Sequence, residues 1–154
     1  MAHRPMLSLK GRALAALARR EYSRLELARK LRPHAESVEQ LDAVLDALAA
    51  DRLLSNERFA ESLARRRGER FGVARVKQEL KSHQLAPELI AVQVDALRES
   101  EYARARGVWE KRFGAPPAEP AARLRQMRFL AARGFSSDVI RRSEERRVGK
   151  ECRS

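Results

Sequence analysis

Apolar residues recur along this chain at the spacing of one face of an α-helix. Val38, Leu41 and Leu45, for example, follow the i, i+3, i+7 rhythm that aligns side chains along a helix. No segment shows the sustained alternation of apolar and polar residues that is typical of a half-buried strand. The pattern therefore predicts an all-α protein.

Helix caps and turn residues divide this pattern into short segments. A first helix is expected over 7–21. Ser23 and Ser37 are suited to cap the next two helices, and Glu26 follows Ser23 at capping-box spacing, while Pro33 ends the first of the two. Further boundaries are expected at 53–56, at 68–72, near Pro87, at 114–120 and at Gly134, with Ser136 or Ser137 opening the last helix.

The helical pattern also repeats. Leu31 and Leu41 have counterparts 49 positions further on, at Leu80 and Ile90, and Leu130 follows Leu80 by 50 positions. A repeat of this length is typical of stacked units, each of which covers the apolar face of its neighbour. We therefore expect tandem three-helix repeats stacked into an elongated, curved molecule. Their expected bounds are 1–55, 56–99 and 100–142.

Residues 143–154 break the repeat. Glu144 and Arg147 stand where the register of the second repeat has apolar residues, and the segment continues as a charged tail that contains the only cysteine, Cys152. The tail is either naturally disordered or foreign to the natural chain. The second interpretation is favoured, because a repeat without its last apolar residues leaves its neighbour uncovered.

Net charge is the bulk property that says most about the function of this chain. The chain has 33 Lys and Arg against 21 Asp and Glu, a net charge of +12. Such an excess favours a polyanionic partner, above all nucleic acid or a protein that carries it, although a solvated basic surface without such a partner is the alternative. Neither a membrane-spanning stretch nor a signal peptide is expected, and one cysteine excludes an internal disulfide. These features predict a cytoplasmic protein.

The positive charge is concentrated on the first two helices of each expected repeat, and acidic residues dominate the third. If equivalent helices line one side of the stack, they form a basic stripe suited to a long, periodic, negatively charged target. Three consecutive arginines, 65–67, cannot all share one helix face. From charge placement alone we predict these contact residues: Arg19, Arg20, Arg24, Arg29, Lys30, Arg65, Arg66, Arg70, Arg75 and Lys77.

Neither a catalytic nor a metal site is predicted. His34 and His83 occupy equivalent loop positions, but no third ligand stands at a suitable spacing, so we interpret both as turn or capping residues. Trp109 and Phe113 are predicted to lie in the core rather than to stack on nucleic-acid bases. Without a phosphate-binding glycine loop or a nucleophile beside a base, the chain is expected to be a non-enzymatic protein with no cofactor.

Three stretches resemble the RecX family of bacterial recombinase regulators. The first is Arg-Arg-Glu-Tyr-Ser-Arg at 19–24 with Glu-Leu and Lys-Leu behind it, and the second is Leu-Leu-Ser-Asn-Glu-Arg-Phe-Ala at 53–60. The third is Leu-Ala-Ala-Arg-Gly-Phe at 130–135, followed by Asp-Val-Ile. The resemblance extends in order from about 7 to 142. Departures are Arg-Pro-His at 32–34, Ser-Asn within the second stretch, and the missing end of the last helix.

The resemblance implies tandem three-helix repeats and a partner, the RecA recombinase, bound chiefly as its filament on single-stranded DNA. Such a regulator, which serves DNA repair and the SOS response, would limit filament extension and lower ATPase and strand-exchange activity. The basic contact residues would then meet the filament or, directly or indirectly, its DNA, and we expect a monomer.

Two other functions stay open. One is a sequence-specific transcription regulator of helix-turn-helix type, because two helices joined by a tight turn can mimic that motif. The other is a structural scaffold made of helical repeats. A repressor would prefer one duplex sequence, whereas a filament regulator would suppress recombinase ATPase at substoichiometric amounts.

Overall fold

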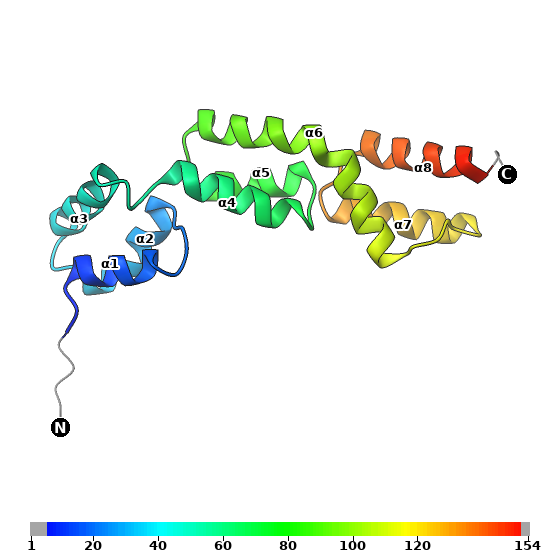
Figure 1. Ribbon diagram of the computed structural model, residues 1–154. Helices are drawn as coiled ribbons and strands as arrows, with labels where there is room; N and C mark the ends of the chain where they lie inside the picture. Colours follow the sequence, from blue (N-terminus) through cyan, green and yellow to red (C-terminus); the bar gives the residue numbers. More distant parts are fainter. Residues whose placement is uncertain (1–5, 152–154) are drawn as a thin grey trace, which may run out of the picture. The chain divides into compact units, whose positions relative to one another are not determined.

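The computed structural model describes residues 6–151, with side chains for 6–145, and the regular structure in this range is entirely helical (Figure 1). The prediction of an all-α protein is confirmed. None of the described helices is long and apolar enough to cross a membrane. The elements are α1 (Leu9–Leu17), α2 (Arg24–Leu31), the 3-10 turn η1 (Arg32–His34), α3 (Val38–Ala50), α4 (Asn56–Gly68), α5 (Val73–Ser82), α6 (Pro87–Arg112), α7 (Pro120–Ala132) and α8 (Ser137–Glu151).

The chain forms two compact units. Unit 1 contains the residues up to Ser62 together with His83–Leu85, and unit 2 contains Leu63–Ser82 and the chain from Ala86 onward. The short segment His83–Leu85 therefore belongs to unit 1 although it lies between two segments of unit 2. The three repeat boundaries expected from the sequence stay predictions beside this division.

Unit 1 is held by the packing of α1, α2 and α3. The predicted caps are confirmed: the Ser23 hydroxyl accepts the Glu26 N–H at 3.1 Å, and the Ser37 hydroxyl accepts the Gln40 N–H at 3.1 Å. The first helix is shorter than expected and ends at Leu17. The largest fully buried side chains of this core are Leu27, Leu31, Leu45 and Leu48.

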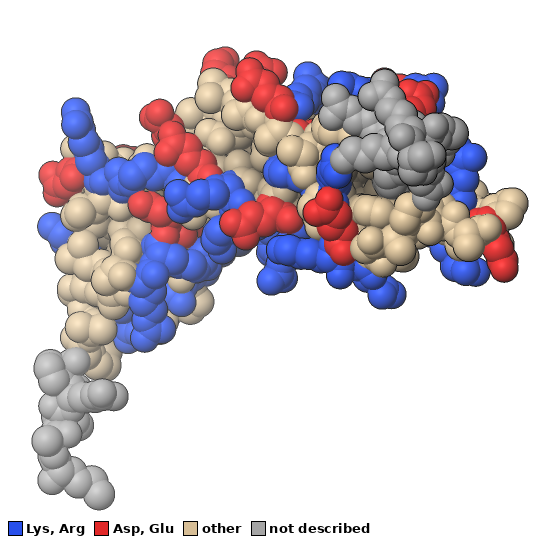
Figure 2. All heavy atoms as spheres, turned by 45° about the vertical axis from the view of Figure 1, so that its right-hand side comes forward, with Lys and Arg blue, Asp and Glu red and all other residues tan. Residues whose placement is uncertain are grey.

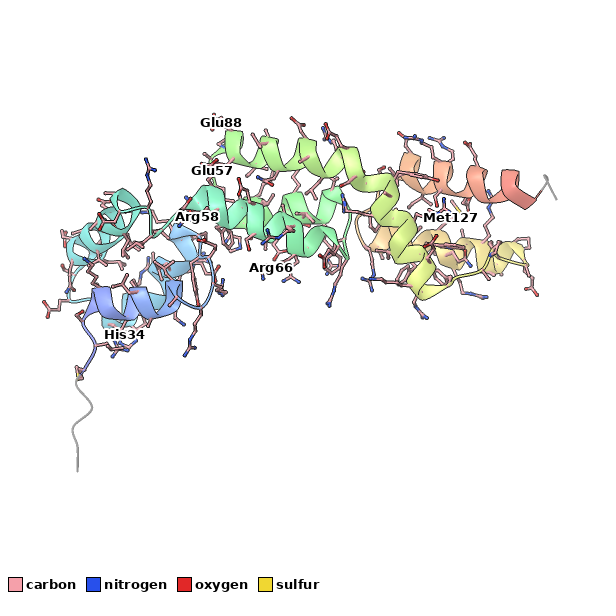
Figure 3. All side chains as sticks on the ribbon, viewed as in Figure 1. His34, Glu57, Arg58, Arg66, Glu88 and Met127 are labelled. Carbon is pink, nitrogen blue, oxygen red and sulfur yellow. The ribbon has the colours of Figure 1, made fainter. Side chains whose placement is uncertain are left out.

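In unit 2, helices α6, α7 and α8 share a second core. Trp109 is buried there and its indole N–H donates to the side-chain oxygen of Gln126 at 2.8 Å, so its predicted core position is confirmed. Met127, on α7 in Figure 3, packs against the same cluster. Phe113 is half-buried at its edge. The buried members are Ala105, Val108, Trp109, Leu130, Phe135, Val139 and Ile140.

One continuous helix, α6, replaces two expected ones. The sequence pattern predicts separate helices before and after residue 99, but α6 runs for 26 residues through that point. Leu97, Glu101 and Ala105 are all buried at intervals of four, so a single inward face continues across the expected boundary. Because neither glycine nor proline stands between Leu97 and Ala105, nothing in the local sequence interrupts the helix.

Two charged residues of α6 form hydrogen bonds with backbone groups at the ends of other helices in unit 2. One Glu101 carboxylate oxygen accepts the N–H of Val73, at the start of α5, at 3.4 Å and the N–H of Ser136, just before α8, at 3.2 Å. The Arg104 guanidinium donates to the carbonyl oxygens of Gly68 and Phe71, each at 2.7 Å. Burial lowers the pKa of Arg104, and the Glu101 charge acts against this shift.

The turns before α5 and α8 meet through their backbones. The Gly72 N–H donates to the Arg133 carbonyl at 2.8 Å, and the Ala74 N–H donates to the Gly134 carbonyl at 3.3 Å. A Cβ atom on Gly72 would lie 2.3 Å from the Gly134 carbonyl carbon. Gly134 follows α7 with φ +89°, the left-handed conformation predicted for a helix end. Ser136 opens α8, because its hydroxyl accepts the Val139 N–H at 3.2 Å.

The expected tail begins as part of α8. Where the sequence pattern offered a disordered segment from residue 143, the structure continues the helix through Glu151; the foreign origin of the segment stays a prediction. Ser143 and Glu144 are buried, and the Arg123 guanidinium holds the Glu144 carboxylate through two nitrogens, at 2.9 and 3.1 Å. This contact raises the pKa of Arg123. Cys152 lies outside the described residues.

Candidate polyanion-binding surfaces

The predicted contact residues of unit 1 divide into paired and unpaired cations. The Arg20 guanidinium lies 3.7 Å from the centre of the Tyr22 ring and is paired with Glu26, a contact that raises its pKa. Arg24 is paired with Asp46 at 2.7 Å. Because their charges are already matched by carboxylates, Arg20 and Arg24 are weaker candidates for contact with a polyanion than the sequence suggested.

The other three predicted residues of unit 1 are exposed. Arg19 lies beyond the end of α1, and Arg29 and Lys30 stand in the last turn of α2. Within the described residues these three are in no ion pair, so their charge is available to a partner. They are the strongest contact candidates of this unit.

Arg19 and Lys30 also line a pocket of about 420 Å³ in unit 1. Tyr22 and Leu31 are buried side chains of its wall, and His34, labelled in Figure 3, is exposed beside it. The pocket combines an apolar surface with positive charge, which suits a small anionic group. Its lining is Leu7, Arg12, Ala15, Ala16, Arg19, Tyr22, Lys30, Leu31 and His34.

The predicted contact residues of unit 2 lie on α4 and α5 and on the turn between them. Arg65 and Arg70 are exposed and are in no ion pair within the described part of the chain. Arg66, labelled in Figure 3, is exposed on α4, and Lys77 is half-buried on α5. Figure 2 shows Lys and Arg side chains gathered along the lower edge of unit 2 in that view.

The arginine run at 65–67 behaves as the helix geometry requires. Arg67 pairs with Glu79 of α5 at 3.2 Å. One member of the run therefore links α4 to α5 through a surface ion pair, while all three arginines are exposed. The continuous stripe expected along the whole chain stays a prediction.

Arg75 belongs to a stacked group that sequence reasoning missed. Its guanidinium carbon lies 4.0 Å from the centre of the Phe71 ring. Arg133 lies 5.6 Å from the same ring and 4.8 Å from Phe129, and Arg112 lies 5.9 Å from Phe129. These alternating planar groups form what we call the arginine–phenylalanine ladder. Its members are Phe71, Arg75, Arg112, Phe113, Phe129 and Arg133.

One local signal points to the ladder. Phe129 and its neighbour Arg133, the C-cap of α7, are four residues apart, the spacing at which helical side chains meet, and Phe71, just before α5, precedes Arg75 by the same interval. Nothing in the sequence places the two pairs together. In the folded chain the turns that carry them meet at the backbone junction, where the Gly72 N–H donates to the Arg133 carbonyl. Phe113 completes the group with its ring centre 5.3 Å from that of Phe129, edge to face.

The two histidines have separate surroundings. The His83 Nδ1 lies 2.8 Å from the Ser23 hydroxyl, and its ring centre lies 4.5 Å from that of Phe59. This contact fits the interpretation of His83 as a residue that supports a helix cap. His34 instead lines the pocket of unit 1. Within the described residues, no three His, Cys, Asp or Glu side chains are grouped to hold a metal ion.

The helices, caps and exposed cations together define an all-α protein with exposed basic residues on both units. Models of the second and third three-helix domains of RecX match residues 55–92 and 99–142. Regulatory protein RecX of Ralstonia nicotianae is 55% identical over 139 residues, 90% of this chain and 87% of that protein. The RecX protein of Leptothrix cholodnii is also 55% identical, over 90% and 88% of the two chains. The chain belongs to the RecX family.

Solved structures show the same fold. A crystal structure of RecX from Lactobacillus salivarius aligns with a TM-score of 0.69 at 19% identity, over 90% of this chain and 93% of that one. A second crystal structure of regulatory protein RecX also has a TM-score of 0.69, at 18% identity, over 89% and 71% of the chains. The predicted RecX resemblance and the all-α repeat fold are thereby confirmed. The family's regulatory role extends to this chain.

Proposed function

We propose that this protein is a negative regulator of the RecA recombinase, which binds the RecA filament on single-stranded DNA and lowers its ATPase and strand-exchange activity. The observation that carries the proposal is the 55% identity to regulatory RecX proteins over 90% of the chain. The exposed, unpaired cations of both units supply a physical means of binding. Arg29 in unit 1 and Arg65 and Arg70 in unit 2 lead this set.

A filament on DNA suits such a protein because its negative charges repeat along its length. Contacts from two units of one chain raise each other's effective concentration, so several weak contacts give firm binding. Where the contacts are with phosphates, affinity falls steeply as salt rises. Inhibition by this protein is therefore expected to weaken in high salt.

The test is RecA ATPase on single-stranded DNA, titrated with the protein. We expect inhibition at substoichiometric amounts. The charge-reversed variant R29E/R65E/R70E is expected to lose inhibition by tenfold or more, because each reversal replaces an attraction with a repulsion. Its thermal unfolding midpoint should stay close to that of the natural sequence, since the three side chains are exposed and in no described ion pair.

The matched control is K10E/K81E/R98E. These three residues are also exposed and unpaired within the described range, and their reversal changes the net charge equally. They lie outside the predicted contact set, so the control is expected to inhibit normally. Full inhibition by R29E/R65E/R70E, or equal losses in both variants, would contradict the proposed contacts. Tight binding to one duplex sequence without RecA would favour a transcription regulator.

A further inference from the structure

The structure of unit 2 points to a binding site for the bases of single-stranded nucleic acid, formed by the arginine–phenylalanine ladder. The proposal rests on the proposed function for its setting, since a filament regulator works beside single-stranded DNA, but its geometry stands on unit 2 alone. It assigns to the ladder a direct contact with bases, where the proposed function needs only a charged surface.

The first support is the alternation of planar groups. Going through the ladder, Arg75, Phe71 and Arg133 succeed one another at 4.0 and 5.6 Å. Phe129 and Arg112 continue the order at 4.8 and 5.9 Å. Each guanidinium therefore lies within cation–π distance of a ring, a contact that favours stacking of the two planar groups. Flat, oriented π and guanidinium faces are the surfaces on which unstacked bases bind.

The second support is that no described carboxylate neutralises the arginines of the ladder. Arg75 and Arg112 are exposed, and within the described residues neither is in an ion pair. Arg133 donates only to a carbonyl, that of Arg70, at 3.4 Å. Other arginines of unit 2 are matched by carboxylates, as Arg67 is by Glu79 and Arg106 by Glu110. Arg75 and Arg112, at the two ends of the ladder, are thus exposed and keep a charge that no described carboxylate neutralises.

The third support is a further cation on the same helix face. Arg125 precedes Phe129 by four residues and Arg133 by eight, so the three share one side of α7. The Arg125 side chain is exposed and in no described ion pair. A strand whose base stacks on the ladder can therefore place its phosphates near this guanidinium.

These features select a single strand over a duplex or an acidic peptide. In a duplex the base faces are covered by neighbouring pairs, so a stacking surface gains nothing from them. An acidic peptide could pair with the arginine charges, but its carboxylates would not stack on the alternating guanidinium and phenyl groups. Because every base has a flat face, the site is expected to tolerate many sequences.

The experiment measures fluorescence anisotropy of the whole protein with three labelled probes and no recombinase. The probes are a single-stranded oligothymidylate, an abasic phosphodiester of equal length and a duplex. The decisive variant is R75K/R112K, which keeps the positive charge but removes two guanidinium planes. The control is R98K/R141K, which makes the same chemical change at exposed arginines of unit 2 outside the ladder.

We expect the natural sequence to bind oligothymidylate at least about fivefold more tightly than the abasic strand. R75K/R112K should lose this preference while binding the abasic strand as before, and R98K/R141K should keep it. Equal binding of the two strands by the natural sequence, a preference retained in R75K/R112K, or stronger binding of the duplex would overturn the proposal. RecA inhibition that persists alongside such a result would leave the proposed function standing, so the two failures are distinguishable.

Discussion

The His83 Nδ1 lies 2.8 Å from the Oγ atom of Ser23, although the two residues are 60 positions apart. Ser23 is fully buried and caps α2, where it accepts the Glu26 N–H. The turn after α5 is thus attached to the start of α2, and the His83 ring also packs against Phe59. This relationship explains why His83–Leu85 belongs to unit 1.

Ser23→Ala removes two contacts at once. It deletes the N-cap of α2 and leaves the His83 nitrogen without its hydroxyl partner, so we expect a loss of about 2–3 kcal/mol in the free energy of unfolding. Ser37→Ala is the matched control, because Ser37 only caps α3, and about 1 kcal/mol is expected. Urea denaturation followed by circular dichroism measures both. Equal losses would show that the His83 contact contributes nothing.

Gly72→Ala tests the backbone junction of unit 2. The added methyl group would lie 2.3 Å from backbone atoms of Gly134 and Phe135, which cannot move without opening the turn. We expect a loss of more than about 2 kcal/mol in the free energy of unfolding. Gly107→Ala has the opposite expectation, a gain of about 0.5–1 kcal/mol, since it lies inside α6 with nothing within 4 Å of the new methyl. Loss of stability in both variants would contradict this reading of the junction.

Glu101→Gln tests the carboxylate that accepts backbone N–H groups at the starts of α5 and α8. The amide keeps an acceptor oxygen but loses the negative charge that strengthens the bonds to Val73 and Ser136 and balances Arg104. A loss of about 1–3 kcal/mol in the free energy of unfolding is expected. Glu99→Gln, at an exposed position of the same helix, should change it by less than about 0.5 kcal/mol. Chemical denaturation of the two variants decides the matter.

Glu144→Leu tests the register of the last helix. The repeat pattern expects an apolar residue at this buried position, and its partner Arg123 is at the surface, where it can return to water. The thermal unfolding midpoint is therefore expected to hold or rise. Arg123→Gln should lower it, because the buried carboxylate then has no guanidinium. A midpoint that falls further in Glu144→Leu than in Arg123→Gln would contradict the register.

Features that depend on neighbours in sequence could be predicted from sequence. The caps Ser23 and Ser37 follow from side chains that reach their own backbone a few residues on. The continuity of α6 was missed because the repeat pattern suggested a boundary that the local sequence does not enforce. Glu101 was missed for another reason: the backbone N–H groups that donate to its carboxylate, those of Val73 and Ser136, are 28 and 35 residues away.

The candidate contact residues likewise include some features that the sequence could predict and others that depend on the folded backbone. Charge placement predicted Arg29, Arg65 and Arg70 as contact residues, and these are exposed and unpaired in the described structure. It could not tell them from Arg20 and Arg24, because the carboxylates that neutralise those two are chosen by the folded backbone. The ladder required knowledge of which loops meet, and periodicity carries no such information.

Because Gly72 and Gly134 have no side chains, their backbones can approach closely, and this close approach positions the six side chains of the arginine–phenylalanine ladder. Phe71 and Arg133 stand directly beside these glycines, so the spacing of the stacked planes is inherited from a backbone contact. A screen for variants that no longer hold single strands should therefore return changes at Gly72 and Gly134 as readily as changes at the arginines. Such glycine variants would lose binding although neither glycine contributes a side chain to the ladder. Their lowered stability would distinguish them from variants that remove a stacked arginine.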